Sequence, residues 1–111
     1  MLHEIKHIVK KENALRKEYL GIDFEVLATG KESMVTKMLF KDGDFAPLHK
    51  HPNEQNGYVI SGQYKLTLNK KEYFIICGDS YSIPANAEHS LEIIEAGEII
   101  DVFTPIRQDY L

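Results

Sequence analysis

Short runs rich in apolar, aromatic and β-branched residues follow one another from Gly21 onward. They are IDFEVLA, MVTKMLF, GQYKLTL, EYFIICG, DSYSIP, HSLEIIE and EIIDVFTP. In MVTKMLF the apolar residues Met34, Met38 and Phe40 fall on one face of an extended chain, because successive side chains of a strand point to opposite sides. These runs therefore predict a series of short β-strands.

Turn signals separate the runs. They are Asp42-Gly43, Ser61-Gly62, Asn69-Lys70, Cys77-Gly78 and Ala96-Gly97. Among them, Asp42-Gly43 is the strongest hairpin signal and Asn69-Lys70 the weakest. Many short strands with close turns and no internal helix predict an all-β sandwich or barrel.

The first twenty residues, MLHEIKHIVKKENALRKEYL, are instead rich in lysine and glutamate. Ile5, Ile8 and Val9 lie at helical spacing, so a short helix and a mobile or edge-packing arm are both open. His3 and His7 are four residues apart, a spacing that would suit a metal pair on a helix, but we expect a solvated segment there. We therefore divide the chain into an N-terminal arm, 1–20, and one β domain, 21–111.

Composition narrows the class of protein. A chain of 111 residues has room for one modest core, and a net charge of −4 gives no electrostatic footprint for nucleic acid. No apolar run reaches membrane-spanning length, and we expect neither a secretory signal nor membrane contact. The single cysteine, Cys77, fits a reducing compartment and is expected to be a buried core residue. The predicted location is the cytoplasm.

The stretch HKHPNEQNGYVISG, residues 49–62, carries the candidate chemistry. His49 and His51 are two residues apart, which would place both imidazoles on one face of a strand. Pro52-Asn53 fits a turn that returns Gln55 on the neighbouring strand, and His89 arrives from a distant one. Three neutral imidazoles and an amide oxygen suit a borderline divalent ion with positions open for water or substrate. The alternative is that these histidines make ordinary hydrogen bonds in the core or on the surface.

The spacing of this stretch resembles the first signature motif of the cupin superfamily, and a later segment resembles the second. The first reads Gly43, five residues, His49, one, His51, three, Gln55, six, Gly62. The second reads Gly78, five residues, Pro84, one, Asn86, two, His89. Gln55 stands where most members have glutamate, Ile93 where asparagine is common, and Asn86 where glycine is usual. Asparagine tolerates the left-handed backbone better than other non-glycine residues.

This resemblance implies a cupin β-barrel of the jelly-roll type, with one divalent transition metal ion (Ni, Zn, Fe, Mn or Co) on His49, His51, Gln55 and His89. Four neutral ligands would leave the ion its full charge, which favours Lewis-acid work over stabilising an oxidised iron. Glu54, beside Gln55, should face the opposite side by alternation.

The C-terminal run EIIDVFTPIRQDYL adds two candidates. Asp101 either faces the barrel interior beside the metal or is a surface carboxylate. Because burying a carboxylate is costly, an inward Asp101 would mark a wet cavity and a candidate general base. Arg107 either binds a substrate carboxylate bidentately or pairs with Asp109 or Glu98.

Together HPNEQNGYVISG, GDSYSIP and DVFTPIRQDYL are similar to the pectin-degradation cupins of the KdgF type. That resemblance implies an enzyme that opens 4,5-unsaturated uronates, small sugar acids released by pectate and alginate lyases, into linear keto acids. Asp101, Phe103 and Arg107 would be its catalytic residues. The rivals are a metal-dependent dioxygenase on a small organic acid and a non-enzymatic ligand-sensing cupin. We also expect a homodimer, because a small barrel with a leftover N-terminal segment has an edge to cover.

Overall fold

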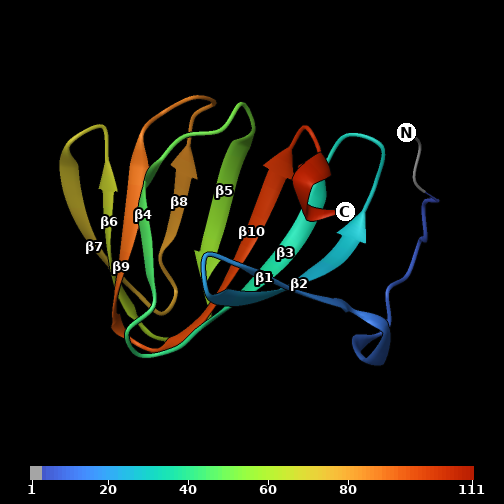
Figure 1. Ribbon diagram of the computed structural model, residues 1–111, viewed down its shortest axis with the longest axis horizontal. Coiled ribbons are helices and arrows are strands. Elements are labelled where there is room, and N and C mark those ends of the chain that lie inside the picture. The colour runs from blue at the N-terminus through green and yellow to red at the C-terminus, as the bar shows by residue number, and fades with distance from the viewer. Residues whose placement is uncertain (1–3) are drawn as a thin grey trace.

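The computed structural model describes residues 4–111 as two antiparallel sheets that face each other (Figure 1). The strands are β1 (Leu15–Tyr19), β2 (Ile22–Thr29), β3 (Met34–Phe40), β4 (Phe45–His49), β5 (Glu54–Val59), β6 (Gln63–Leu68), β7 (Lys71–Ile76), β8 (Ser80–Ile83), β9 (His89–Glu95) and β10 (Gly97–Thr104), and the 3-10 helices are η1 (Lys11–Asn13) and η2 (Gln108–Tyr110). The six-stranded sheet has the order β1-β2-β3-β10-β5-β8, and the four-stranded sheet has the order β4-β9-β6-β7.

From β3 to β10 the chain changes sheet at every connection except β6–β7. This winding is that of a jelly roll, and it confirms the predicted all-β class. It also brings strands that are distant in sequence side by side, such as β4 with β9 and β5 with β10. The ligand and acid candidates come from these four strands or the segments that follow them.

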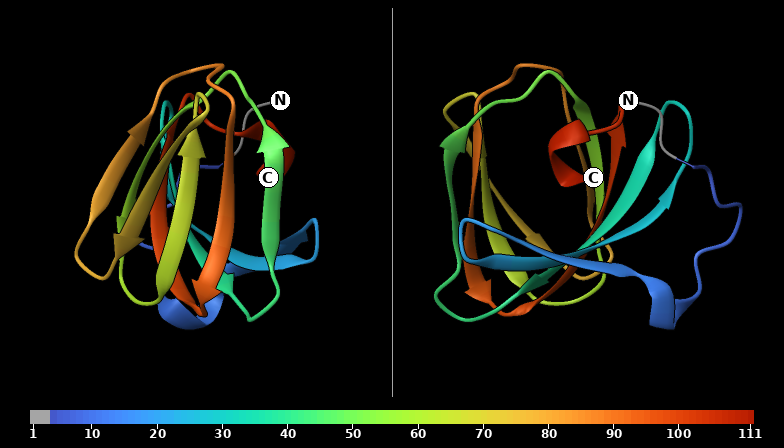
Figure 2. Two further views of the ribbon diagram at one scale, coloured as in Figure 1. Left: turned by 90° about the vertical axis from the view of Figure 1, so that its left-hand side faces the viewer. Right: turned by 45° about the vertical axis from the view of Figure 1, so that its right-hand side comes forward.

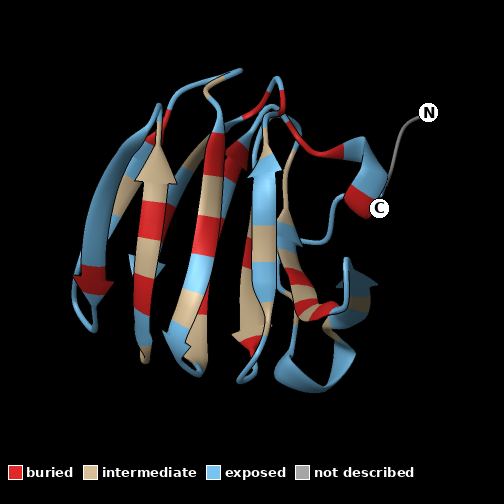
Figure 3. Ribbon diagram, turned by 60° about the vertical axis from the view of Figure 1, so that its left-hand side comes forward, coloured by how far each residue is buried: buried red, intermediate tan, exposed pale blue. Residues whose placement is uncertain are grey.

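The core lies between the sheets, on the faces that alternation predicted. Ile22, Phe24 and Val26 of β2 are buried, as are Tyr64 and Leu66 of β6. Figure 3 shows buried positions alternating with intermediate and exposed ones along strands of the fold. Removing such a large apolar side chain from water stabilises the fold by roughly 1.5–3 kcal/mol. The period-two pattern therefore identified the inward faces of these strands correctly.

The predicted ranking of the two hairpin signals, Asp42-Gly43 above Asn69-Lys70, was wrong. Asp42-Gly43 joins β3 to β4, which belong to different sheets, so it is a turn between layers. The tight hairpin is Asn69-Lys70, where Leu68 pairs with Lys71 and both turn residues have positive φ, 48° and 70°. Two positive φ values characterise the type I′ turn, whose twist matches that of the flanking strands.

The six-stranded sheet also includes part of the segment 1–20 that was predicted as an N-terminal arm. β1 pairs along its whole length with β2, and Leu20-Gly21 (φ 54° and 79°) closes this hairpin. The right panel of Figure 2 shows it crossing in front of the space between the sheets. Before β1, the only helix among the described residues is η1, so His7 lies exposed in an irregular stretch. His3 is outside the described residues.

Cys77 is exposed, so its predicted place in the core was wrong. It follows β7, an edge strand of the four-stranded sheet on which only Ile75 is buried. The neighbouring Phe74 and Ile76 are exposed as well, because no layer among the described residues covers the outer face of this edge. No helix among the described residues is long and apolar enough to cross a membrane.

Candidate metal and catalytic site

Two of the predicted ligands lie opposite each other on paired strands. His49 is the last residue of β4, His89 is the first of β9, and the register of the two strands pairs them directly. Their ring centroids are 4.2 Å apart. β4 ends at His49, so the prediction that both histidines of the HKH stretch belong to one strand face was wrong. His51 lies in the loop that follows, and its ring is 4.9 Å from that of His89.

The three imidazoles form one cluster. One nitrogen of each lies within 4.8 Å of one nitrogen of the others, so the group could hold a metal ion. His51 and His89 are buried, whereas His49 is partly exposed. The three residues come from segments up to forty positions apart, and the jelly-roll winding brings them together.

Backbone carbonyls determine which nitrogen of each imidazole faces the cluster. The Nδ1 atoms of His49, His51 and His89 lie 2.7, 2.9 and 2.8 Å from the carbonyl oxygens of Pro47, Asn53 and Ala87. A carbonyl oxygen accepts only, so Nδ1 carries the proton and Nε2 keeps its lone pair. This pairing of one ring N–H with a carbonyl is typical of metal-binding histidines.

Two further features of the histidine cluster fit a bound cation. The Nε2 atom of His89 is buried and has no hydrogen-bond partner within residues 4–111, although buried polar groups normally have one. Nε2 of His51 lies 3.0 Å from Oε1 of Gln55. Both of these atoms are acceptors when Nδ1 of His51 is protonated, and a cation between them would satisfy both. The donor set of three imidazoles and one amide oxygen therefore fits a divalent ion.

The surroundings of His51 and His89 favour the neutral imidazole, the form that binds metal. Burial lowers the pKa of His89 to about 4, and the neighbouring histidines and Arg107 act in the same direction. Burial and Arg107 also lower the pKa of His51. Desolvation disfavours the charged imidazolium, so neither ring has to lose a proton at neutral pH to become a ligand.

Asp101 faces the interior, and the surface alternative is excluded. It lies in the middle of β10, is only 3% exposed and accepts a hydrogen bond from the hydroxyl of Tyr81 at 2.6 Å. Burial raises the pKa of Asp101 to about 6, while hydrogen bonds from Tyr81 and Gln55 and the charge of Arg107 oppose the rise. A carboxyl group with a pKa near neutrality suits proton transfer.

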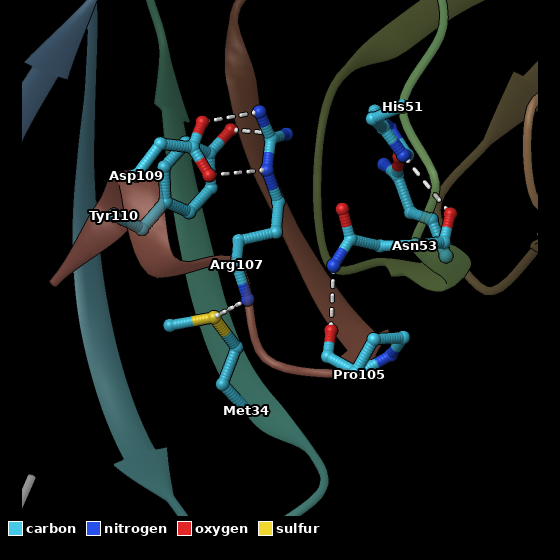
Figure 4. A network of polar contacts seen from close by, with 8 residues as sticks. Met34, His51, Asn53, Pro105, Arg107, Asp109 and Tyr110 are labelled. Carbon is cyan, nitrogen blue, oxygen red and sulfur yellow. Dashed lines mark hydrogen bonds and ion pairs between the residues drawn. The ribbon is translucent and has the colours of Figure 1, made fainter. Parts of the chain in front are cut away.

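Arg107 is buried in an aromatic and acidic setting (Figure 4). Its Nε and Nη2 lie 3.3 and 2.8 Å from the two carboxylate oxygens of Asp109, and Nη1 donates to the hydroxyl of Tyr110 at 2.9 Å. The guanidinium also lies over the rings of Phe103 and Tyr110, at 5.2 and 4.0 Å from their centroids. Of the two expected acidic partners, the structure therefore pairs Arg107 with Asp109 and not with Glu98.

Two contacts anchor the segment that carries Arg107. The side-chain amide of buried Asn53 donates to the carbonyl of Pro105 at 2.7 Å, and the backbone N–H of Arg107 lies 3.2 Å from Sδ of Met34 (Figure 4). Asn53 therefore links the loop of His51 to the C-terminal segment. Phe103 packs between His51 and Arg107, and its ring centroid lies 5.8 Å from that of His51.

Most of these residues line one cavity between the sheets. Its polar lining comes from His49, Gln55, Tyr81, His89, Asp101 and Arg107. Tyr19 and Leu20 of the β1–β2 hairpin also line it, together with apolar residues of the inner sheet faces. Asp109 is not among the lining residues, and Glu54 is exposed, as alternation predicted.

Sequence reasoning missed Tyr81, Asn53 as an anchor, and the hairpin residues Tyr19 and Leu20. For Tyr81 a signal existed, because alternation in SYSI places it on the same face as buried Ile83. For the hairpin there was none, because the strand LRKEY of β1 lacks an apolar alternating pattern.

Comparisons with known proteins find relatives in sequence and in fold. A family model described as the cupin domain matches residues 36–103. The chain is 28% identical over 93 residues to the pectin degradation protein KdgF of Dickeya dadantii (strain 3937), a match that covers 82% of this chain and 84% of that protein. An RmlC-like cupin from Shewanella frigidimarina NCIMB 400 superposes with a TM-score of 0.89 at 25% identity over 96% of both chains. KdgF from Halomonas sp. superposes with a TM-score of 0.84 at 23% identity, over 96% of this chain and 99% of that one.

Proposed function

Because the chain belongs to the cupin family and resembles its KdgF type, we propose that it is a metal-dependent enzyme that opens and tautomerises 4,5-unsaturated uronates to linear keto acids. One observation carries the proposal. A single cavity is lined by His49, Gln55 and His89 of the candidate ligand set, by a buried carboxyl group and by a buried guanidinium, and His51 belongs to the same histidine cluster. An acidic sugar that must exchange protons needs these three kinds of group.

The ligand set would hold the metal ion that acts as the electrophile. A divalent ion on His49, His51, Gln55 and His89 would act as a Lewis acid toward a ring or ring-opened oxygen of the substrate. The chain's part is to present four uncharged donors, three from strands and His51 from the loop after β4, so that the charge of the ion is not cancelled by a ligand. The three Nδ1 hydrogen bonds hold the imidazoles in place for this task.

Asp101 is the group that moves protons in this proposal. Opening of the ring leaves an enol, and its conversion to a ketone requires a proton to leave oxygen and another to reach carbon. With a pKa of about 6, Asp101 accepts and returns a proton at neutral pH without a large energetic penalty. Asp101 lines the cavity that the substrate would fill.

Arg107 holds the substrate carboxylate. Asp109 occupies the edge formed by Nε and Nη2, and Nη1 spends one N–H on Tyr110. Nη1 and Nη2 each have a second N–H, and together these form another bidentate edge. Since Arg107 lines the cavity and Asp109 does not, we assign Asp109 the role of orienting the guanidinium from behind.

The test is an assay on freshly lyase-digested uronate. Metal-loaded protein should remove the absorbance of the conjugated C4–C5 double bond faster than the spontaneous reaction does. A rate equal to the spontaneous one would contradict the proposal. In that case, oxygen uptake with a small organic acid would favour the dioxygenase, and binding of a sugar acid without turnover would favour a ligand-sensing cupin.

A further inference from the structure

A row of four residues crosses the inner face of the six-stranded sheet at the level of Asp101. Thr36 of β3 pairs with Asp101 of β10, Asp101 pairs with Gly57 of β5, and Gly57 pairs with Tyr81 of β8. All four belong to adjacent strands, so their positions are fixed by the backbone ladder. Gly57 and Tyr81 occupy unspecified positions of the two cupin-like motifs, and the role given to Asp101 above makes no use of them.

Gly57 leaves the space in which the ring of Tyr81 lies. A Cβ atom at Gly57 would come within 2.1 Å of Cζ of Tyr81 and within 2.4 Å of its hydroxyl oxygen. Real Cβ contacts are never that short, so any other residue at position 57 would displace the ring. The phenol therefore reaches across one strand, over a residue without a side chain, to the next strand.

The ring ends on the carboxylate of Asp101. The hydroxyl of Tyr81 donates to Oδ1 of Asp101 at 2.6 Å, a short distance that is typical of a hydrogen bond to a charged acceptor. Burial and the neighbouring Asp101 raise the pKa of Tyr81 well above its usual value, so the phenol stays protonated and donates. On the other side of Asp101, the hydroxyl of Thr36 is buried and finds no hydrogen-bond partner in the part of the chain that the structure describes.

We propose that Tyr81 is a positioning residue that holds Asp101 by Oδ1 and thereby directs Oδ2 toward the substrate, and that Gly57 is required because it makes room for this contact. This inference rests on the proposed function. Carboxyl groups rotate readily about their terminal bond, and proton transfer requires a fixed donor–acceptor geometry. The short hydrogen bond from Tyr81 to Oδ1 supplies that constraint.

The test compares Tyr81→Phe with wild type and with Tyr58→Phe, all fully loaded with metal. Phenylalanine keeps the ring packed and removes only the hydroxyl. We expect kcat to fall by about 10- to 100-fold, because misorientation of a catalytic group has effects of this order, while KM and metal content stay within twofold. Tyr58 is 51% exposed on β5, so its substitution should leave kcat unchanged.

Gly57→Ala provides a second variant that acts on the same contact. It should lower kcat to a similar extent, and combining it with Tyr81→Phe should cost little more than the more severe single change, because both remove one hydrogen bond. Thermal unfolding checks that each variant is folded.

Either of two results would overturn this inference alone: an active wild type with Tyr81→Phe at the same kcat, or a Tyr81→Phe variant whose loss lies in KM. The second result would mean that the phenol binds substrate itself. Wild-type protein that does not exceed the spontaneous rate would overturn the proposed function, and the inference with it.

Discussion

At the scale of single residues, the site depends on side chains that are oriented by their own neighbours in the chain. Each histidine of the cluster bonds a backbone carbonyl two positions away, at Pro47, Asn53 or Ala87. Such short-range contacts form as soon as the loop does, so the direction of Nε2 is set locally. The long-range step is only the pairing of strands that brings the three histidines together. The HKH spacing could therefore be recognised in the sequence, although the strand that was expected to carry both histidines ends at His49.

The neutrality of Gln55 can be tested by Gln55→Glu. A carboxylate is a good ligand, so the variant should keep its metal content. It should lose turnover for two reasons. The added charge weakens the Lewis acidity of the ion, and a carboxylate cannot donate the hydrogen bond that the Gln55 amide gives toward Asp101.

Metal analysis and turnover, measured on the same preparation of Gln55→Glu, check both parts. His49→Ala combined with His51→Ala is the reference for metal loss, since it removes half of the ligand set, and His7→Ala is the control at an exposed histidine. Unchanged turnover in fully loaded Gln55→Glu protein would show that ligand neutrality does not matter here.

Asp101→Asn tests the assigned proton transfer. The amide is nearly the same size and can still accept from Tyr81, so the fold and the metal content should persist. Because general acid–base catalysis contributes roughly 10²–10⁴-fold, kcat should fall on that scale. Steady-state kinetics on lyase-digested uronate measure the fall, and Glu54→Gln, on the exposed side of β5, is the matched control. An Asp101→Asn variant as active as wild type would leave ring opening in place and remove Asp101 from the proton transfer.

At the scale of secondary-structure elements, the sequence identified strands better than their connections. Alternation marks the buried face of a strand whatever its partner, so β2, β3 and β6 were readily predicted. A turn pair carries no information about which sheet receives the next strand. Asp42-Gly43 therefore looked like a hairpin, although it joins the two layers. β1 was missed because its pairing with β2 depends on partners along the backbone and not on an apolar face.

The β1–β2 hairpin permits a prediction about both stability and binding. Leu20 has φ 54°, a left-handed conformation that is unfavourable for leucine. Leu20→Asn makes this turn an Asn-Gly pair, which favours the type I′ geometry, and should raise the free energy of unfolding by about 0.5–1 kcal/mol. Because Leu20 lines the cavity, KM should change too. Chemical denaturation and steady-state kinetics provide the two measurements.

Lys70→Gly is the matched control for Leu20→Asn. It also makes an Asn-Gly pair, in the β6–β7 hairpin, where Lys70 has φ 70° and does not line the cavity. It should therefore give a similar gain in stability and leave KM unchanged. Equal KM values for both variants and wild type would mean that the β1–β2 hairpin does not contact substrate.

At the scale of the whole molecule, the jelly roll explains why the site could be assembled from the sequence only in part. The paired motifs indicated which ligands meet, and the structure brings His49, His51 and His89 together as expected. The contacts that refine the site run across three strands or into the C-terminal segment, as with Tyr81 on Asp101 and Asn53 on Pro105. No local pattern reports such contacts, because they depend on sheet order and on the absence of a side chain at Gly57.

The exposed β7 edge of the four-stranded sheet is relevant to how copies of the chain assemble. β7 is an edge of the four-stranded sheet, and Phe74 and Ile76 on its outer face are 71% and 54% exposed. Edge strands with exposed apolar side chains tend to pair or to be covered in native proteins. We propose that the chain forms a homodimer in which a second copy covers β7.

Light scattering of purified protein, at roughly micromolar to 100 micromolar concentration, tests this assembly. Wild type should have the mass of two chains, and Phe74→Ser combined with Ile76→Thr should have the mass of one, since the substitutions remove most of the apolar surface of the β7 edge. Phe45→Ser, at an exposed phenylalanine on the opposite edge strand β4, is the control and should remain dimeric. A monomeric wild type would contradict the homodimer. A double variant that remains dimeric would move the interface to another edge, of which the β1 edge is the one that adjoins the N-terminal segment.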